Sequence, residues 1–131
     1  MFKQHMNYKT GSETFLQVPA TAAESYVPGE ALVFGEDGTV TKCAGAVTPD
    51  FICQEKTTAA EGDYLAATLV HDQQLLEVPL QAAGTALVVG NKVTVGTDGL
   101  SVTATTTSGV FLIAEILGTA VGDMVRGYFK R

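Results

Sequence analysis

Histidines and cysteines, which often serve in catalysis or bind metals, are few in this chain and widely spaced. Its histidines are His5 and His71 and its cysteines are Cys43 and Cys53, and none of them stands in the HExxH or CxxC spacing of a metal site. No GxSxG motif marks a nucleophile, and no phosphate-binding or dinucleotide fingerprint is present. The sequence therefore predicts no catalytic residue, no metal site and no cofactor, and we expect a protein that is not an enzyme.

Two acids and two thiols each allow more than one interpretation. Glu55 and Glu115 hold equivalent places in the repeat described below, and paired carboxylates serve glycoside hydrolases. Because the chain has no tryptophan to form an aromatic platform for a sugar, we interpret both as acids at strand ends that bind loop amides. Cys43 and Cys53 are interpreted as small buried hydrophobes, and a disulfide across a hairpin is the alternative.

The length, composition and charge of the chain indicate the class of protein that carries these residues. A length of 131 residues suits one domain, and 46% hydrophobic residues with 14 glycines are typical of a turn-rich β protein that can build a core. A net charge of −6 disfavours nucleic acid as a partner. No apolar run approaches the roughly twenty residues that span a bilayer, and none resembles a signal peptide. We therefore expect a soluble protein made in the cytosol, with no membrane partner.

The strongest pattern in the sequence is an internal repeat. Residues 29–38 (GEALVFGEDG) align with residues 90–99 (GNKVTVGTDG) at a constant offset of sixty-one. After a one-residue gap, FICQE at 51–55 aligns with FLIAE at 111–115, and the Gly-Asp pairs that follow align as well. Because glycines, acids and apolar positions all stay in register, we expect two copies of one unit.

Each unit is predicted to consist of strands joined by tight turns. Strand-prone runs at 31–34 and 92–95 each lead into an Asp-Gly pair, which favours a hairpin because glycine accepts a positive φ. The apolar runs at 51–53 and 110–116 are assigned to the core, and a Gly-Asp turn follows each. A structural role is assigned to the turn residues Asp37, Gly38, Gly62, Asp63, Asp98, Gly99, Gly122 and Asp123.

Short strands at regular spacing, without a long amphipathic helix, indicate an all-β fold. We expect a small β-barrel or sandwich built from two repeats related by a pseudo-twofold axis, with an extended N-terminal arm. The arm spans residues 1–24 and the duplicated β-domain residues 25–131. Within the domain, repeat one covers about 26–70, a connecting strand 71–86 and repeat two about 87–131.

The arm lies outside the repeat and carries scattered apolar residues. One interpretation is a frayed terminus or a strand packed on the domain. The other is a segment that orders against a partner, and it predicts that the domain folds without residues 1–18. Under the second interpretation, the candidate contact residues are Phe2, Tyr8, Phe15, Leu16 and Val18.

The repeated pattern resembles a known family. GEALVFGEDGTV followed by FICQE and GDYL, and GNKVTVGTDGLSV followed by FLIAE and GDMV, are similar to the capsid cement, or decoration, proteins of tailed bacteriophages. The resemblance covers about residues 26–131 and rests on turn chemistry, which other small β proteins share.

The resemblance implies a β-rich structural protein of the virion. Such a protein binds the outer surface of the expanded capsid, clamps subunits of the major capsid protein and stabilises the shell. It often associates as a homo-oligomer, a trimer on the capsid, and contacts the shell through an N-terminal segment. It would be located on the capsid surface, and in the host cytoplasm before assembly.

Two other functions remain open from the sequence. One is another structural component of a phage, such as a head fibre or a tail part. The other is a carbohydrate-binding or ligand-binding β-module. Such modules display aromatic side chains in a groove, whereas most of the four tyrosines and six phenylalanines fall on strands assigned to the core.

Overall fold

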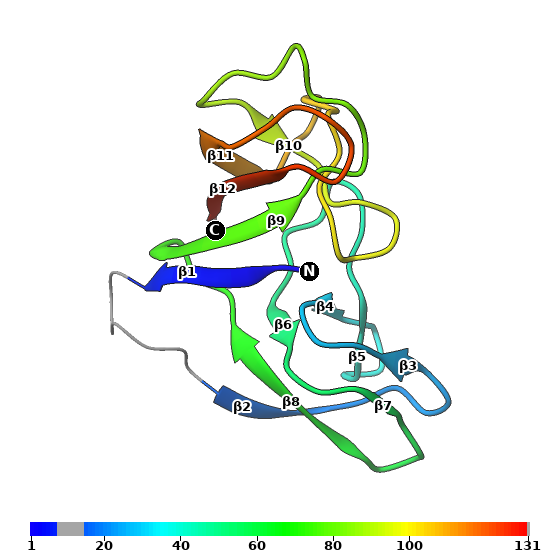
Figure 1. Ribbon diagram of the computed structural model, residues 1–131. Helices are drawn as coiled ribbons and strands as arrows, with labels where there is room; N and C mark the ends of the chain where they lie inside the picture. The colour runs from blue at the N-terminus through cyan, green and yellow to red at the C-terminus, as the bar shows by residue number, and fades with distance from the viewer. Residues whose placement is uncertain (8–14, 131) are drawn as a thin grey trace.

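The computed structural model describes residues 1–7 and 15–130, and none of these residues lies in a helix. The strands form two five-stranded antiparallel sheets and a two-stranded ribbon. In Figure 1 one sheet occupies the lower part of the view and the other the upper part. The predicted all-β class is confirmed, and the two sheets fit a sandwich.

The first sheet is built mostly from the N-terminal half of the chain. The two strands of the short ribbon come from the same part of the chain, one between β2 and β4 and the other between β6 and β8. Its strands follow the order β2-β8-β6-β4-β5. The bounds are β2 Phe15–Pro19, β8 Tyr64–Leu69, β6 Phe51–Cys53, β4 Ala31–Phe34 and β5 Val40–Lys42, with β3 Ser25–Tyr26 and β7 Thr57–Thr58 in the ribbon.

The second sheet joins the beginning of the chain to its end. Its strands follow the order β1-β9-β12-β11-β10, and β1 runs beside β9 in Figure 1. The bounds are β1 Lys3–Asn7, β9 Gln74–Pro79, β12 Met124–Phe129, β11 Phe111–Ile116 and β10 Lys92–Val93.

The two sheets pair their central strands in matching registers. Phe51 of β6 lies opposite Leu69 of β8. In the second sheet Phe111 of β11 lies opposite Phe129 of β12, sixty residues further along on both strands. The neighbouring strands β4 and β10 pair with β6 and β11 in corresponding registers.

The matching registers extend to β2 and β9. Pro19 of β2 lies opposite Tyr64, and Pro79 of β9 lies opposite Met124. The two strands also resemble each other, since β2 reads FLQVP and β9 contains LLEVP. β2 falls in the predicted arm and β9 in the predicted connecting strand, whereas in the structure the two hold corresponding places beside β8 and β12.

The described part of the predicted arm is built into both sheets. β1 pairs with β9 and β2 pairs with β8. Phe2 and Val18 are 2% and 4% exposed, so both side chains belong to the core, while Tyr8 lies outside the described residues. Because this segment supplies a strand to each sheet, the structure gives no support to the expectation that the domain folds without residues 1–18.

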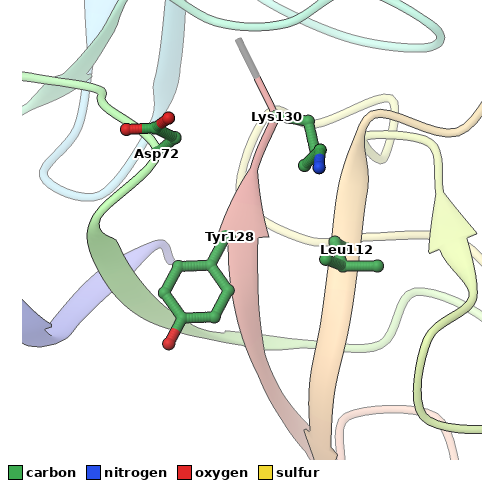
Figure 2. A pocket seen from close by; sticks show the side chains of 4 residues that line it. All are labelled: Asp72, Leu112, Tyr128 and Lys130. Atoms are coloured by element: carbon green, nitrogen blue, oxygen red, sulfur yellow. The ribbon is translucent and has the colours of Figure 1, made fainter.

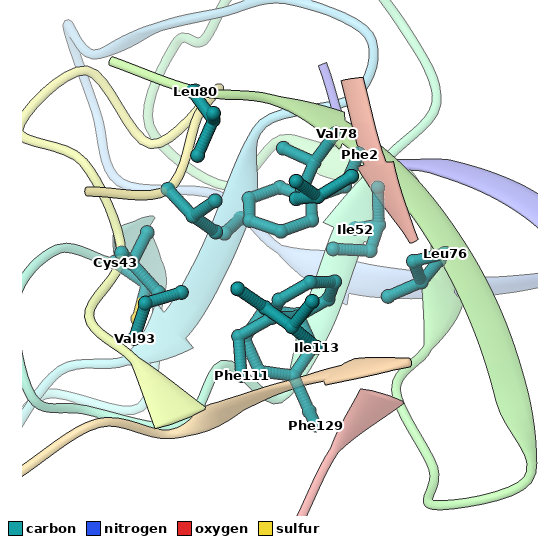
Figure 3. Packing of buried hydrophobic residues seen from close by; sticks show 14 of the residues in the cluster. Phe2, Cys43, Ile52, Leu76, Val78, Leu80, Val93, Phe111, Ile113 and Phe129 are labelled. Carbon is teal, nitrogen blue, oxygen red and sulfur yellow. The ribbon is translucent and has the colours of Figure 1, made fainter. Parts of the chain in front are cut away.

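The hydrophobic core consists of two clusters, one of which joins the two sheets. The larger, which we call the shared cluster, combines the second sheet, through residues such as Phe111 and Phe129, with Ala31 and Ile52 from the first sheet. Figure 3 shows the Phe2 ring among these side chains. The first-sheet cluster lies around Leu32, Val18 and Tyr26, among others. Strand alternation explains the division, because successive residues of a strand face opposite sides of its sheet.

The two sheets are used differently despite their matching registers. Ala31 and Ile52 face the shared cluster, so the first sheet is covered on both faces at its centre. The corresponding residues of the second sheet are Lys92, which is exposed, and Leu112, which is half-buried. The second sheet therefore keeps one face open to solvent.

In both Asp-Gly turns the aspartate accepts one backbone amide and one hydroxyl hydrogen bond. Asp37 Oδ1 accepts bonds from the Thr39 amide at 3.2 Å and the Thr39 hydroxyl at 2.8 Å. Asp98 Oδ1 accepts from the Leu100 amide at 2.9 Å and the Ser101 hydroxyl at 2.8 Å. The aspartate side chain thus fixes the backbone just after the turn in both places.

The two Gly-Asp turns are also alike. Asp63 Oδ2 accepts a bond from the Ala60 amide at 2.8 Å, and Asp123 Oδ2 accepts one from the Ala120 amide at 3.0 Å. The glycine of each turn has a positive φ, 83° at Gly62 and 88° at Gly122, which glycine adopts without steric cost.

Candidate interaction surface

The two cysteines are free thiols in the hydrophobic interior. Cys43 belongs to the shared cluster and Cys53 to the first-sheet cluster. Each Sγ donates to a backbone carbonyl, that of Val47 at 3.2 Å and that of Glu55 at 3.1 Å. Burial raises the pKa of Cys43 to about 12 and the pKa of Cys53 to about 11. The interpretation of both as small buried hydrophobes is confirmed.

The two equivalent glutamates have different partners. Glu55 Oε1 accepts a hydrogen bond from the Ala66 amide at 3.1 Å, as expected of an acid at a strand end. Glu115 Oε2 instead lies 3.0 Å from Nη1 of Arg126. Arg126 Nε also lies 3.6 Å from Glu77 Oε2, so this arginine links β9, β12 and β11. Ion pairs this exposed to solvent stabilise a fold by at most about 1 kcal/mol.

A surface hollow of about 270 Å³ is lined by Asp72, Leu112, Tyr128 and Lys130. In Figure 2 these side chains stand apart around the hollow, and the Tyr128 hydroxyl points away from Asp72 and Lys130. Covalent catalysis needs a nucleophile and a base that point toward each other. The described residues that line this hollow do not form such a pair. Among the described residues there is also no group of three or more His, Cys, Asp or Glu side chains that could hold a metal ion.

A buried carboxyl group stands out among the polar residues. Glu30 is only 4% exposed, and its Oε1 has no hydrogen-bond partner among the described residues. Burial is the largest cause that raises the pKa of Glu30, to about 7. Nearby Lys42 opposes the increase, while the charges of Glu24 and Asp98 add to it. Glu30 is therefore a titratable group inside the fold.

Exposed apolar side chains gather at one end of the first sheet. Leu16 and Leu69 are 38% and 39% exposed, and Phe34 is 46% exposed. The Phe34 ring meets the Phe51 ring edge-on, with 5.3 Å between centroids, and Leu69 lies opposite Phe51 in the sheet. We call the surface formed by Leu16, Phe34 and Leu69, together with the Phe51 ring buried beneath them, the open end. Phe15, adjacent to it on β2, is 63% exposed.

The candidate contact residues thus divide into two groups. Phe15 and Leu16 are exposed, whereas the side chains of Phe2 and Val18 are buried and face the core. Sequence reasoning missed Phe34 and Leu69. It assigned both to strands, and nothing in their own pattern distinguishes a strand end that is covered from one that is open.

Comparisons with known proteins bear on the fold. No family model matches the chain, and no curated protein matches it. Among solved structures, it is similar to the N base of the head fiber gp8.5 of bacteriophage phi29, with a TM-score of 0.60 and 17% identity. The match covers 89% of this chain and 95% of that chain. At this identity the likeness establishes a shared fold.

Within the described residues, no helix is long and apolar enough to cross a membrane.

Proposed function

We propose that this protein is a non-enzymatic structural component of a phage virion, which binds the outer surface of the expanded capsid and stabilises it. The observation that supports this most is the shared fold with the base of a phage head fiber over 89% of the chain. The sequence resemblance to capsid decoration proteins points to the same place on the virion. The major capsid protein is the proposed partner, and a homotrimer on the capsid is the proposed assembly.

The physical logic of such a protein is multiplicity. Many copies bind equivalent sites on a symmetric shell, so a modest affinity per copy can add up to a large stabilisation when each copy bridges neighbouring subunits. Exposed Phe15 and Leu16 supply apolar area for such a contact. The net charge of −6 disfavours binding to packaged or cellular nucleic acid.

A head-fibre base is the second candidate, and the structural likeness itself favours it. Both candidates attach to the head, but they differ in number and effect. A decoration protein occupies a repeated site over the whole shell and protects the shell against disruption. A fibre base instead occupies a limited set of sites and leaves shell stability nearly unchanged.

The test is binding of the purified protein to expanded empty capsids, compared with unexpanded ones. We expect saturation at a fixed number of sites on expanded capsids only, with a rise in the temperature at which the shells fall apart. A Phe15→Ser variant is expected to bind at least about tenfold more weakly. Val121→Ser, at a side chain 66% exposed between β11 and β12, is the matched control.

The outcomes separate the candidates. Saturation at few sites without a change in shell stability would favour the fibre base over the decoration protein. Absence of saturable binding to either capsid form would contradict both.

A further inference from the structure

The outer edge of β9 is covered by a strand, and the corresponding edge of β2 is not. β1 pairs with β9, with Lys3 opposite Glu77 and Gln4 opposite Leu76. β2 holds the place beside β8 that β9 holds beside β12. However, β2 is the last strand of its sheet. Ala20, just beyond β2, forms a parallel bridge with Val40 of β5, but among the described residues no strand pairs with the outer edge of Phe15, Leu16 and Gln17. An uncovered edge presents backbone amides and carbonyls that can pair with another strand.

β1 brings a large side chain as well as a strand. Phe2, the residue before β1, packs on Phe129 with 5.2 Å between ring centroids and on Phe111 with 6.0 Å. Together with Ala31 and Ile52 from the first sheet, it belongs to the shared cluster. As a result, this end of the second sheet is closed.

The corresponding positions of the first sheet form the open end. Leu16 corresponds to Leu76 and Leu69 to Phe129 in the matching registers. Leu16 is 38% exposed and Leu69 is 39% exposed, whereas Leu76 is 1% exposed and Phe129 is not exposed. Phe34 is 46% exposed, and Val95, its equivalent in the repeat, is 1% exposed. The first sheet thus lacks both an edge strand equivalent to β1 and a large apolar side chain equivalent to that of Phe2.

We propose that the edge of β2 and the open end together form a docking site for an extended segment of another protein. The segment adds a strand antiparallel to β2, beside Phe15, Leu16 and Gln17, and inserts one large apolar side chain against Phe51 and Leu69. The internal precedent sets the register. In the second sheet the buried Phe2 directly precedes Lys3, which lies opposite Glu77, and Glu77 corresponds to Gln17 of β2. By analogy, the inserted side chain belongs to the residue just before the one that lies opposite Gln17.

A second copy of this chain fits the site less well. Its own β1 is held in place by the burial of Phe2 and by a hydrogen bond from the Met1 amino group to the Leu100 carbonyl. Its β2 offers a short edge that ends at Pro19, which has no amide to donate. The site is therefore assigned to a partner of different sequence, recognised by backbone pairing and one apolar anchor. This inference does not depend on the proposed function.

The test uses a synthetic peptide with the sequence of residues 1–7, MFKQHMN, added to the full-length protein. Backbone amide resonances report where the peptide binds. We expect saturable shifts at Leu16, Gln17, Phe34 and Leu69. A peptide with Phe2→Ser is expected to bind at least about tenfold more weakly, because it lacks the apolar anchor.

Two protein variants complete the test. Leu69→Glu places a charge in the open end, and we expect it to abolish the shifts. Val121→Glu is the matched control, at an exposed apolar residue of a loop in the second sheet, and should bind the peptide as the unmodified protein does. Amide spectra of both variants without peptide establish that they are folded.

Three results would overturn the proposal. The first is no shift at millimolar peptide. The second is shifts confined to Leu75 and Leu76, which would mean that the peptide only exchanges with β1. The third is concentration-dependent self-association that protects the amides of β2, which would assign the site to a second copy of the chain.

Discussion

Phe2 packs its ring against that of Phe129, with 5.2 Å between the centroids, so the second residue of the chain is part of the core that the last strand completes. Phe2 is 2% exposed and Phe129 is not exposed. The contact links the beginning of the chain to its end across the second sheet. Residues 1–7 are therefore part of the packed structure and not an appendage to it.

Phe2→Ala is therefore expected to destabilise the protein strongly. Removing a buried phenylalanine side chain leaves a cavity and costs about 3–5 kcal/mol. Urea unfolding, followed by far-UV circular dichroism, measures the loss. Phe15→Ala is the control, because Phe15 is 63% exposed and its truncation should change the free energy of unfolding by no more than about 0.5 kcal/mol. Equal effects of the two substitutions would contradict the assignment of Phe2 to the core.

The all-β class and the turns could be predicted from sequence because both follow from local chemistry. Asp37 and Asp63 sit beside glycines, and the structure shows their carboxylates bonded within the turns. The roles of residues 1–24 could not be predicted in the same way. Phe2 is buried against Phe111 and Phe129, more than a hundred residues away, and no periodicity in a five-residue strand specifies partners at that distance.

The internal repeat remains a prediction, which the matching registers support. The similarity of FLQVP in β2 to LLEVP in β9 was available in the sequence. The predicted repeat, whose alignment starts at Gly29, does not include it. The open end was beyond sequence reasoning for a different reason. Leu69 and Phe129 occupy corresponding strand positions, and only packing from elsewhere in the chain makes one exposed and the other buried.

If the two halves are copies of one unit, their Gly-Asp turns should contribute equally to stability. Asp63→Ala and Asp123→Ala each remove one hydrogen bond from a side chain to a loop amide, to Ala60 and Ala120 respectively. Each is expected to lower the free energy of unfolding by about 1 kcal/mol. The double variant should show the sum, since the turns lie in different sheets. A large effect at one site with none at the other would count against equivalence of the turns.

Glu30 makes stability depend on pH. Its pKa is about 7 in the folded protein, against 4.5 for an ordinary glutamate side chain, so the folded state binds the proton more tightly than the unfolded chain does. Stability contributed by the protonated form is present in full below pH 4.5 and is lost as the pH rises to about 7. Glu30→Gln, which keeps a neutral side chain, is therefore expected to stabilise the protein by about 2–3 kcal/mol at pH 8, and by little at pH 4.

Urea midpoints of the Glu30→Gln variant at the two pH values measure this effect. Lys42, Glu24 and Asp98 are the charged groups that act on Glu30, and all three are unchanged in the variant. Glu61→Gln, at an exposed acid in the loop before β8, is the control and should show no such pH dependence. A gain in stability that is the same at pH 4 and pH 8 would show that ionisation of Glu30 is not its cause.

The two thiols are expected to be unreactive in the folded protein. Cys43 and Cys53 are 1% and 0% exposed, and burial raises the pKa of the first to about 12 and of the second to about 11. Because the thiolate is the reactive form, a disulfide reagent at pH 8 should modify neither thiol faster than the protein unfolds. The same reagent in urea should modify both at once, which provides the control. Rapid modification of one thiol in native buffer would contradict this expectation, because it would mean that the region around that cysteine opens without global unfolding. In that case Phe2→Ala should accelerate the reaction of Cys43, which lies in the same cluster as Phe2, but not the reaction of Cys53.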